Sequence, residues 1–187
     1  MLTKIFGFAL ISSLTARRIV LLAVALVLGA CSSLNTARMV PDNDGSLKRK
    51  IASRVRVAEV VGADKVSSFG GAEFIDEAHL STAIISALQK SAIFTSVSTN
   101  EGDIDLFVSV LSQDQKDLSI MHYTARLLVE YRFAARNGDA IWSETYDTTF
   151  SSTAFSGATR TVEAREGAVR QNLSALIQGI NKRWPVK

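Results

Sequence analysis

The thiol of Cys31 is the one cysteine side chain of this 187-residue sequence, and therefore its one candidate sulfur nucleophile. It follows Leu28-Gly29-Ala30, at the end of an apolar run that comes directly after two arginines. The run has 12 uncharged residues, which is fewer than the roughly 20 of a membrane-spanning helix and within the roughly 7–15 of a signal-peptide core. A lone cysteine excludes an internal disulfide framework and a multi-cysteine metal cluster. We therefore expect residues 1–30 to be a signal peptide.

The segment Leu28-Gly29-Ala30-Cys31 resembles the lipobox of bacterial lipoproteins, in which a leucine and two small residues precede the lipid-bearing cysteine. The resemblance implies that the chain is cut between Ala30 and Cys31. It also implies that the thiol carries diacylglycerol and that the new amino group receives an acyl chain such as palmitate. Ser32 stands where inner-membrane lipoproteins typically carry aspartate, so the resemblance implies the outer membrane, on its periplasmic face. The alternative is an uncleaved anchor helix that ends at a buried cysteine.

Few other residues have types and spacing that suit catalysis. His79 and His122 fall in different predicted elements, with no metal-ligand spacing around either. Asp103 and Asp105 flank the start of a predicted strand, without apolar neighbours that would tune one of them as an acid. The sequence contains no nucleophile elbow and no glycine-rich phosphate or dinucleotide motif. We therefore expect no enzyme activity, no catalytic residue, no cofactor and no metal.

The formal charge of +3 describes the precursor. Lys4, Arg17 and Arg18 are the only charged residues of the predicted leader, so its removal leaves 21 − 3 = 18 basic side chains against 18 acidic ones. A neutral mature chain in the cell envelope is a poor match for nucleic acid, which we exclude as a partner.

Residues 31–50 are predicted to be the lipidated cysteine and a flexible tether. The segment from Ser32 to Lys50 has no sustained periodicity, is rich in polar residues and contains Pro41 and Gly45. Residues 51–187 then form the predicted periplasmic domain.

The domain has an α+β pattern. Alternating apolar residues predict strands, and apolar residues at helical spacing predict two amphipathic helices, one of which contains Glu166 and Arg170 as a favourable i,i+4 pair. The predicted strands cover 54–61, 93–98, 103–113, 120–135 and 140–149, and the helices cover about 74–91 and 159–182. Asn137-Gly138 indicates a type I′ hairpin turn. Because the strands each expose a polar face, we expect an antiparallel sheet of about four to five strands with two helices on one face.

Two surfaces are candidates for binding a partner. One is the sheet face that the helices leave uncovered, which bears the charged residues Arg126, Glu130 and Arg132. The other is the polar segment 149–157, in which exposed aromatic rings at Phe150 and Phe155 would suit a protein or a lipid chain. The alternative is that both rings cover the end of the core.

The order of elements, with the segments Asp103–Val108, Ile141-Trp142 and Ala164–Asn172, resembles small Gram-negative lipoproteins of the YajG type. It resembles more loosely the accessory lipoproteins of envelope transport machines, such as LptE of lipopolysaccharide assembly and PqiC-like subunits. The resemblance implies a lipid-anchored, non-enzymatic binding or scaffold subunit of an envelope protein complex. The alternative is a periplasmic lipid- or glycan-binding carrier with an apolar cavity between helices and sheet, lined by Trp142, Tyr131 and Phe133.

Overall fold

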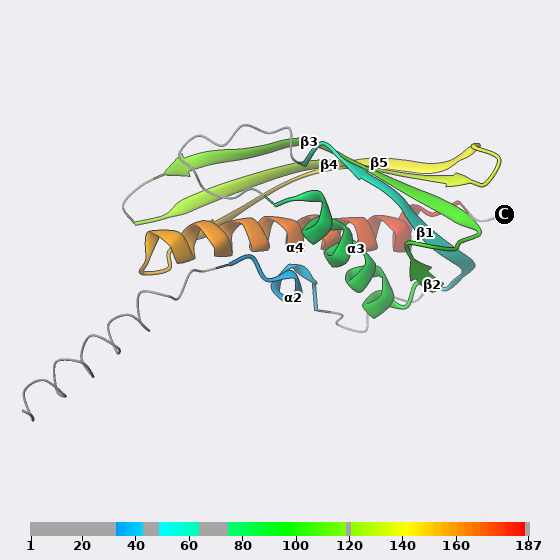
Figure 1. Ribbon diagram of the computed structural model, residues 1–187, viewed down its shortest axis with the longest axis horizontal. Coiled ribbons are helices and arrows are strands. Elements are labelled where there is room, and N and C mark those ends of the chain that lie inside the picture. The colour runs from blue at the N-terminus through cyan, green and yellow to red at the C-terminus, as the bar shows by residue number, and fades with distance from the viewer. Residues whose placement is uncertain (1–32, 43–48, 64–74, 119–120, 186–187) are drawn as a thin grey trace, which may run out of the picture. The chain divides into compact units, whose positions relative to one another are not determined.

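Five strands form one sheet in the order β2-β1-β3-β4-β5 in the computed structural model (Figure 1). The model describes residues 33–42, 49–63, 75–118 and 121–185. The strands are β1 (Ile51–Val61), β2 (Phe94–Ser98), β3 (Ile104–Leu118), β4 (Tyr123–Ala135) and β5 (Ala140–Ser152). All belong to one compact unit, Leu34–Lys187, and the predicted leader falls in a separate unit that, except for Ser33, lies outside the described residues.

The sheet is mixed, so the expectation of a purely antiparallel sheet is wrong. Strand β1 pairs in parallel with both β2 and β3, whereas β3, β4 and β5 form an antiparallel meander. The helix α3 (Glu77–Ser91) is the crossover that a parallel β1–β2 pair requires.

Three helices lie on one side of the sheet, one more than expected, and no helix of the described residues lies on the other side (Figure 1). Besides α3 they are α2 (Thr36–Met39) and α4 (Gly157–Arg183). The side chains of Asp76 and Ser156 cap α3 and α4 by accepting backbone N–H groups of their first turns. No helix in the described part of the chain is long and apolar enough to cross a bilayer.

The core lies between the sheet and the helices, as the alternation along β4 predicts. Every second residue of this strand is buried, beginning with Tyr123 and ending with Phe133. The rings of Phe133 and Trp184 meet edge to face with centroids 5.0 Å apart, and Trp142 and Phe94 pack around them. This aromatic cluster closes the end of the core at which α4 ends.

The β4–β5 hairpin forms as predicted, but its turn is of another type. A type I′ turn needs a positive φ at both central residues, and only Gly138 has one, at 91°. The N–H of Gly138 donates to the carbonyl of Ala135 at 2.8 Å, and the N–H of Ala135 donates to the carbonyl of Asp139 at 2.9 Å. The connection is therefore a type I turn followed by a glycine bulge.

Part of the segment predicted to be a tether packs on the domain. Met39 is fully buried in the core, and Leu34 and Val40 pack against it. The N–H of Asn35 donates to Oε1 of Glu166 at 2.6 Å. Four helical residues are too few to show a periodicity in the sequence, so the pattern gave no sign of this contact. The compact unit that contains the sheet begins at Leu34.

Candidate functional site

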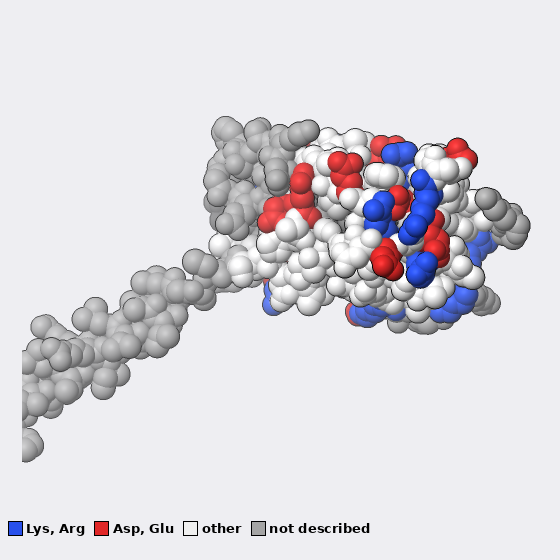
Figure 2. Space-filling model, turned by 45° about the vertical axis from the view of Figure 1, so that its right-hand side comes forward, with Lys and Arg blue, Asp and Glu red and all other residues white. Residues whose placement is uncertain are grey.

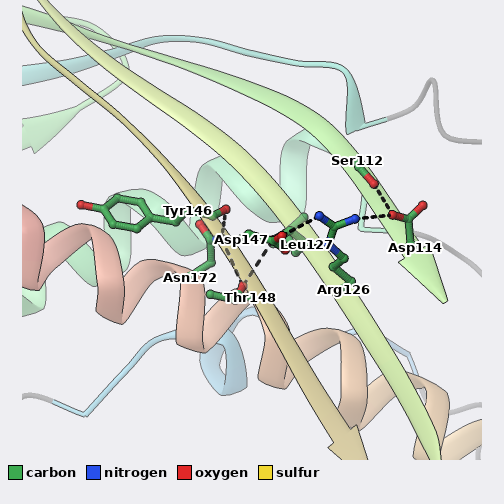
Figure 3. A network of polar contacts seen from close by, with 8 residues as sticks. All are labelled: Ser112, Asp114, Arg126, Leu127, Tyr146, Asp147, Thr148 and Asn172. Atoms are coloured by element: carbon green, nitrogen blue, oxygen red, sulfur yellow. Dashed lines mark hydrogen bonds and ion pairs between the residues drawn. The ribbon is translucent and has the colours of Figure 1, made fainter. Parts of the chain in front are cut away.

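The uncovered face of the sheet bears a line of arginine–carboxylate pairs. Arg126 of β4 binds Asp147 of β5 through two hydrogen bonds, Nε to Oδ1 at 2.7 Å and Nη2 to Oδ2 at 2.5 Å (Figure 3). The same guanidinium reaches Asp114 of β3 at 3.4 Å, and Ser112 donates to that carboxylate. Hydrogen bonds from Arg126 lower the pKa of Asp147, so this carboxylate stays ionised.

A second group of pairs lies on β1 and the start of β3. Arg56 binds Asp105 through two hydrogen bonds of 2.7 and 2.8 Å, and Arg54 binds Asp103 at 2.8 Å. Hydrogen bonds from Arg54 lower the pKa of Asp103 to about 2, and those from Arg56 lower the pKa of Asp105. The two carboxylates are bound to different arginines and both favour the ionised form, so neither has the raised pKa that a general acid needs.

The remaining predicted residues of this face lie between the two groups. The guanidinium of Arg132 sits 4.5 Å from the ring centroid of Phe107, and Ser143 donates to Glu130 at 3.4 Å. The structure thus places Arg126, Glu130 and Arg132 on one face, as predicted. We call this the ion-pair face. Figure 2 shows one side of the molecule, on which Lys and Arg side chains lie next to Asp and Glu side chains.

The opposite side of the same strands is fixed by Asn172 of α4. Its amide nitrogen donates to the carbonyl of Tyr146 at 3.0 Å and to the hydroxyl of Thr148 at 3.1 Å (Figure 3). Its amide oxygen accepts the hydroxyl of Tyr131 at 2.8 Å. Asn172 is fully buried, so these bonds hold α4 in one position against β4 and β5.

The two predicted phenylalanines have different environments. Phe150 packs on Gly167 of α4, where an added Cβ would lie 2.3 Å from its ring, and the Arg170 guanidinium sits 5.5 Å from the ring centroid. Phe155, in the turn between β5 and α4, is fully exposed. Phe150 thus covers the core, as one of the two alternatives predicts, whereas Phe155 is exposed, as the other predicts.

A groove of about 660 Å³ lies beside the aromatic cluster, a feature that sequence reasoning missed. Its lining is mostly apolar and includes Ile51, Ile104, Ile141 and Trp184, together with the basic residues Arg49 and Lys50. The alternative of a carrier requires a cavity at Trp142, Tyr131 and Phe133, but these side chains are buried in the described core. A Trp-Pro pair at the end of a predicted helix was the available signal for the groove.

Glu166 is a second residue whose role the sequence did not reveal. Its side chain is 2% exposed, accepts the N–H of Asn35 and lies 3.8 Å from Arg38, instead of pairing with Arg170 as predicted. Arg170 donates to the carbonyl of Arg38. Burial raises the pKa of Glu166. Glu166 and Arg170 together attach the segment around α2 to α4.

The predicted lipidation site lies outside the described residues. Cys31, Ala30 and the rest of the leader are not among the described residues, so the cleavage and the acylation remain predictions. Within the described part, no group of three or more His, Cys, Asp or Glu side chains is arranged to hold a metal ion.

The fold is similar to those of known bacterial proteins. A Xanthomonas campestris protein of the DUF330 family shares 15% identity at a TM-score of 0.61, covering 80% of this chain and 92% of its own. A hypothetical protein of Chlamydia trachomatis shares 11% identity at a TM-score of 0.50, covering 72% and 99%. A minor lipoprotein of Acinetobacter baumannii shares 14% identity at a TM-score of 0.47, covering 73% and 96%.

These similarities concern the fold. No family model and no curated protein sequence matches the chain. Two of the solved neighbours, both with TM-scores below 0.5, are named as lipoproteins, and the YajG type is not confirmed.

Proposed function

We propose that the protein is a non-enzymatic envelope lipoprotein, held by acyl chains on Cys31, that binds another envelope protein through its ion-pair face. The observation that carries the proposal is the uncovered sheet face, where fixed charges of both signs stand in a regular array. Such an array favours a polar partner surface with a matching pattern and adds specificity more than affinity. The Ser32 signal supports the outer membrane, on its periplasmic face.

The packing of residues 34–42 supports a short connection to the membrane. Two residues separate Cys31 from Leu34, the first residue of the compact unit. An anchored domain held this closely has a high effective concentration for partners at the same membrane surface, so a weak contact is sufficient.

The anchor is tested by mass spectrometry of the protein purified from its own membranes. We expect a chain that begins at Cys31 and carries diacylglycerol and an amide-linked acyl group. A Cys31→Ala variant should leave the membrane fraction while retaining cooperative unfolding. An unmodified Cys31 with the leader still attached would refute the anchor.

The partner surface is tested by placing a photocrosslinking residue at Thr145, on the ion-pair face, in intact cells. The matched control is Gln178, which is exposed on α4. We expect one discrete adduct from Thr145, absent from Gln178 and lost when Arg126→Glu is added. An adduct from Gln178 alone, or one indifferent to Arg126→Glu, would contradict the assignment of this face.

A second candidate function, binding of an amphiphile, is favoured by the groove beside Trp184. A mostly apolar lining that includes the basic residues Arg49 and Lys50 suits an acyl chain with an anionic head. Titration with the anionic dye anilinonaphthalene sulfonate tests it. Ile141→Glu should weaken binding, and Leu111→Glu, at an exposed residue outside the groove lining, should not. Equal binding of the dye by both variants would exclude the groove as the binding site.

A further inference from the structure

The turn that connects β5 to α4 has no charged side chain. Residues 148–159 form an uninterrupted uncharged segment, which we call the tip, and the fully exposed Phe155 lies within it. An exposed aromatic ring among small and hydroxyl side chains is the composition expected where a protein enters the interfacial region of a bilayer.

Several backbone polar groups of the tip are bound within the protein. One nitrogen of Arg160, Nη1, donates to the carbonyls of Ala154 at 2.6 Å and Phe155 at 3.0 Å. The N–H of Ala154 donates to the hydroxyl of Ser152 at 3.2 Å, and Ser156 caps α4. Transfer of an unpaired backbone polar group out of water is costly, and these four bonds avoid that cost for the carbonyls of Ala154 and Phe155 and for the N–H groups of Ala154 and Thr159.

The tip lies near the place where the chain leaves for Cys31. Ser152 donates to Glu163 at 2.6 Å, and the N–H of Asn35 donates to Glu166 at 2.6 Å. These two glutamates are one helical turn apart on α4, about 4.5 Å along its axis. The packed N-terminal segment and the end of β5 are therefore attached to successive turns of one helix.

The length of chain between the packed segment and the acylated residue is short. Cys31 precedes Asn35 by four residues, which span at most about 14 Å when fully extended. Met121, 74% exposed, precedes β4 at this same end of the sheet, since Tyr123 pairs with Ser152. A membrane-embedded acyl chain on Cys31 would thus hold this end of the domain at the bilayer surface.

We propose that the tip contacts the bilayer that holds the anchor and inserts the Phe155 ring into its interfacial region. This inference rests on the lipid anchor of the proposed function and adds the orientation of the domain, with the tip toward the lipid. The exposed ring contacts a phospholipid surface, because the covalently attached acyl chain confines the same end of the domain to that surface.

The test uses the full acylated protein in vesicles of phosphatidylethanolamine and phosphatidylglycerol, with or without brominated acyl chains. Phe155→Trp reports contact between the tip and lipid, after subtraction of the signal of Trp142 and Trp184 in the parent chain. The matched control is Ser143→Trp, nine residues before Ser152 along β5 and so about 30 Å from it.

We expect brominated lipid to lower the subtracted emission of the Phe155→Trp variant roughly twofold or more and to leave that of the Ser143→Trp variant unchanged. Flotation of the vesicles reports the anchor separately. Failure to float would overturn the anchor and the inference with it. Flotation without quenching of the Phe155→Trp variant, or equal quenching of both variants, overturns the insertion alone. A blue-shifted emission of the Phe155→Trp variant without lipid would assign the ring to a second copy of the chain and also overturns it.

Discussion

The two sides of the sheet use polar groups in different ways. On the helix-covered side, Asn172 and Tyr131 are fully buried and bind each other in one geometry. On the ion-pair face, the carboxylates of Asp103 and Asp147 are about half exposed, so water solvates them as well as their arginine partners. Buried hydrogen bonds fix the arrangement of the elements, whereas exposed ion pairs contribute little to stability. The charges of Asp103 and Asp147 can therefore change with little effect on folding.

The largest difference in the free energy of unfolding is expected between substitutions at two neighbouring residues of β4 whose side chains point to opposite faces of the sheet. Phe133→Ala removes a fully buried ring from the aromatic cluster and should lower the free energy of unfolding by about 3–5 kcal/mol. Arg132→Ala removes an exposed side chain and should change it by about 0.5 kcal/mol or less. Urea denaturation followed by Trp fluorescence measures both. Similar losses for the two variants would contradict the contrast.

The buried hydrogen bonds of Asn172 should have the next largest effect. Asn172→Ala leaves the hydroxyl of Tyr131 without its acceptor and should lower the free energy of unfolding by about 1–3 kcal/mol. Gln171→Ala, at the exposed neighbouring position, is the control. A double-mutant cycle with Tyr131→Phe should show that the two losses are not additive. Additive losses would mean that the bond is unimportant.

Glu166 should make stability depend on pH in the direction opposite to that of the ion-pair face. Burial raises its pKa in the folded protein, so its charged form is disfavoured by folding and its contribution falls as pH rises above about 4.5. Glu166→Gln removes this dependence. The stability of the variant relative to the parent should therefore rise between pH 4 and 7, measured by urea denaturation across that range. A relative stability that falls with pH would refute the assignment.

The smallest effect on stability is expected from a substitution of Asp103, because its carboxylate is exposed. Hydrogen bonds from Arg54 lower its pKa to about 2, so the stability that it contributes is present above its ordinary pKa of 3.8 and disappears as pH falls toward 2. Asp103→Asn should be slightly less stable than the parent at pH 7 and equal to it near pH 2. Thermal unfolding at the two pH values measures the difference. A gap that persists at pH 2 would contradict the ion pair.

The sequence predicted most of the elements because side-chain periodicity reports which face of each element is buried. It assigned both faces of β4 correctly, including Arg126 and Arg132 on the uncovered side. The same periodicity occurs in parallel and antiparallel strands, so it could not reveal how β1 pairs. The helical spacing predicts that Glu166 pairs with Arg170, whereas its partner in the structure, Asn35, is 131 residues away in the sequence. Long-range contacts of this kind leave no local pattern.

The position of β1 between β2 and β3 determines when the sheet can be completed. Ile51 pairs with Phe94, and Val55 pairs with Ile104, so this strand has no partner until about 40 or more later residues are present. The meander of β3, β4 and β5 needs only contacts between consecutive strands and can assemble first. A chain that is synthesised or threaded through a pore from its N-terminus therefore emerges with an unsatisfied strand edge, and shielding this edge from aggregation until the C-terminal half arrives is a requirement of its biogenesis.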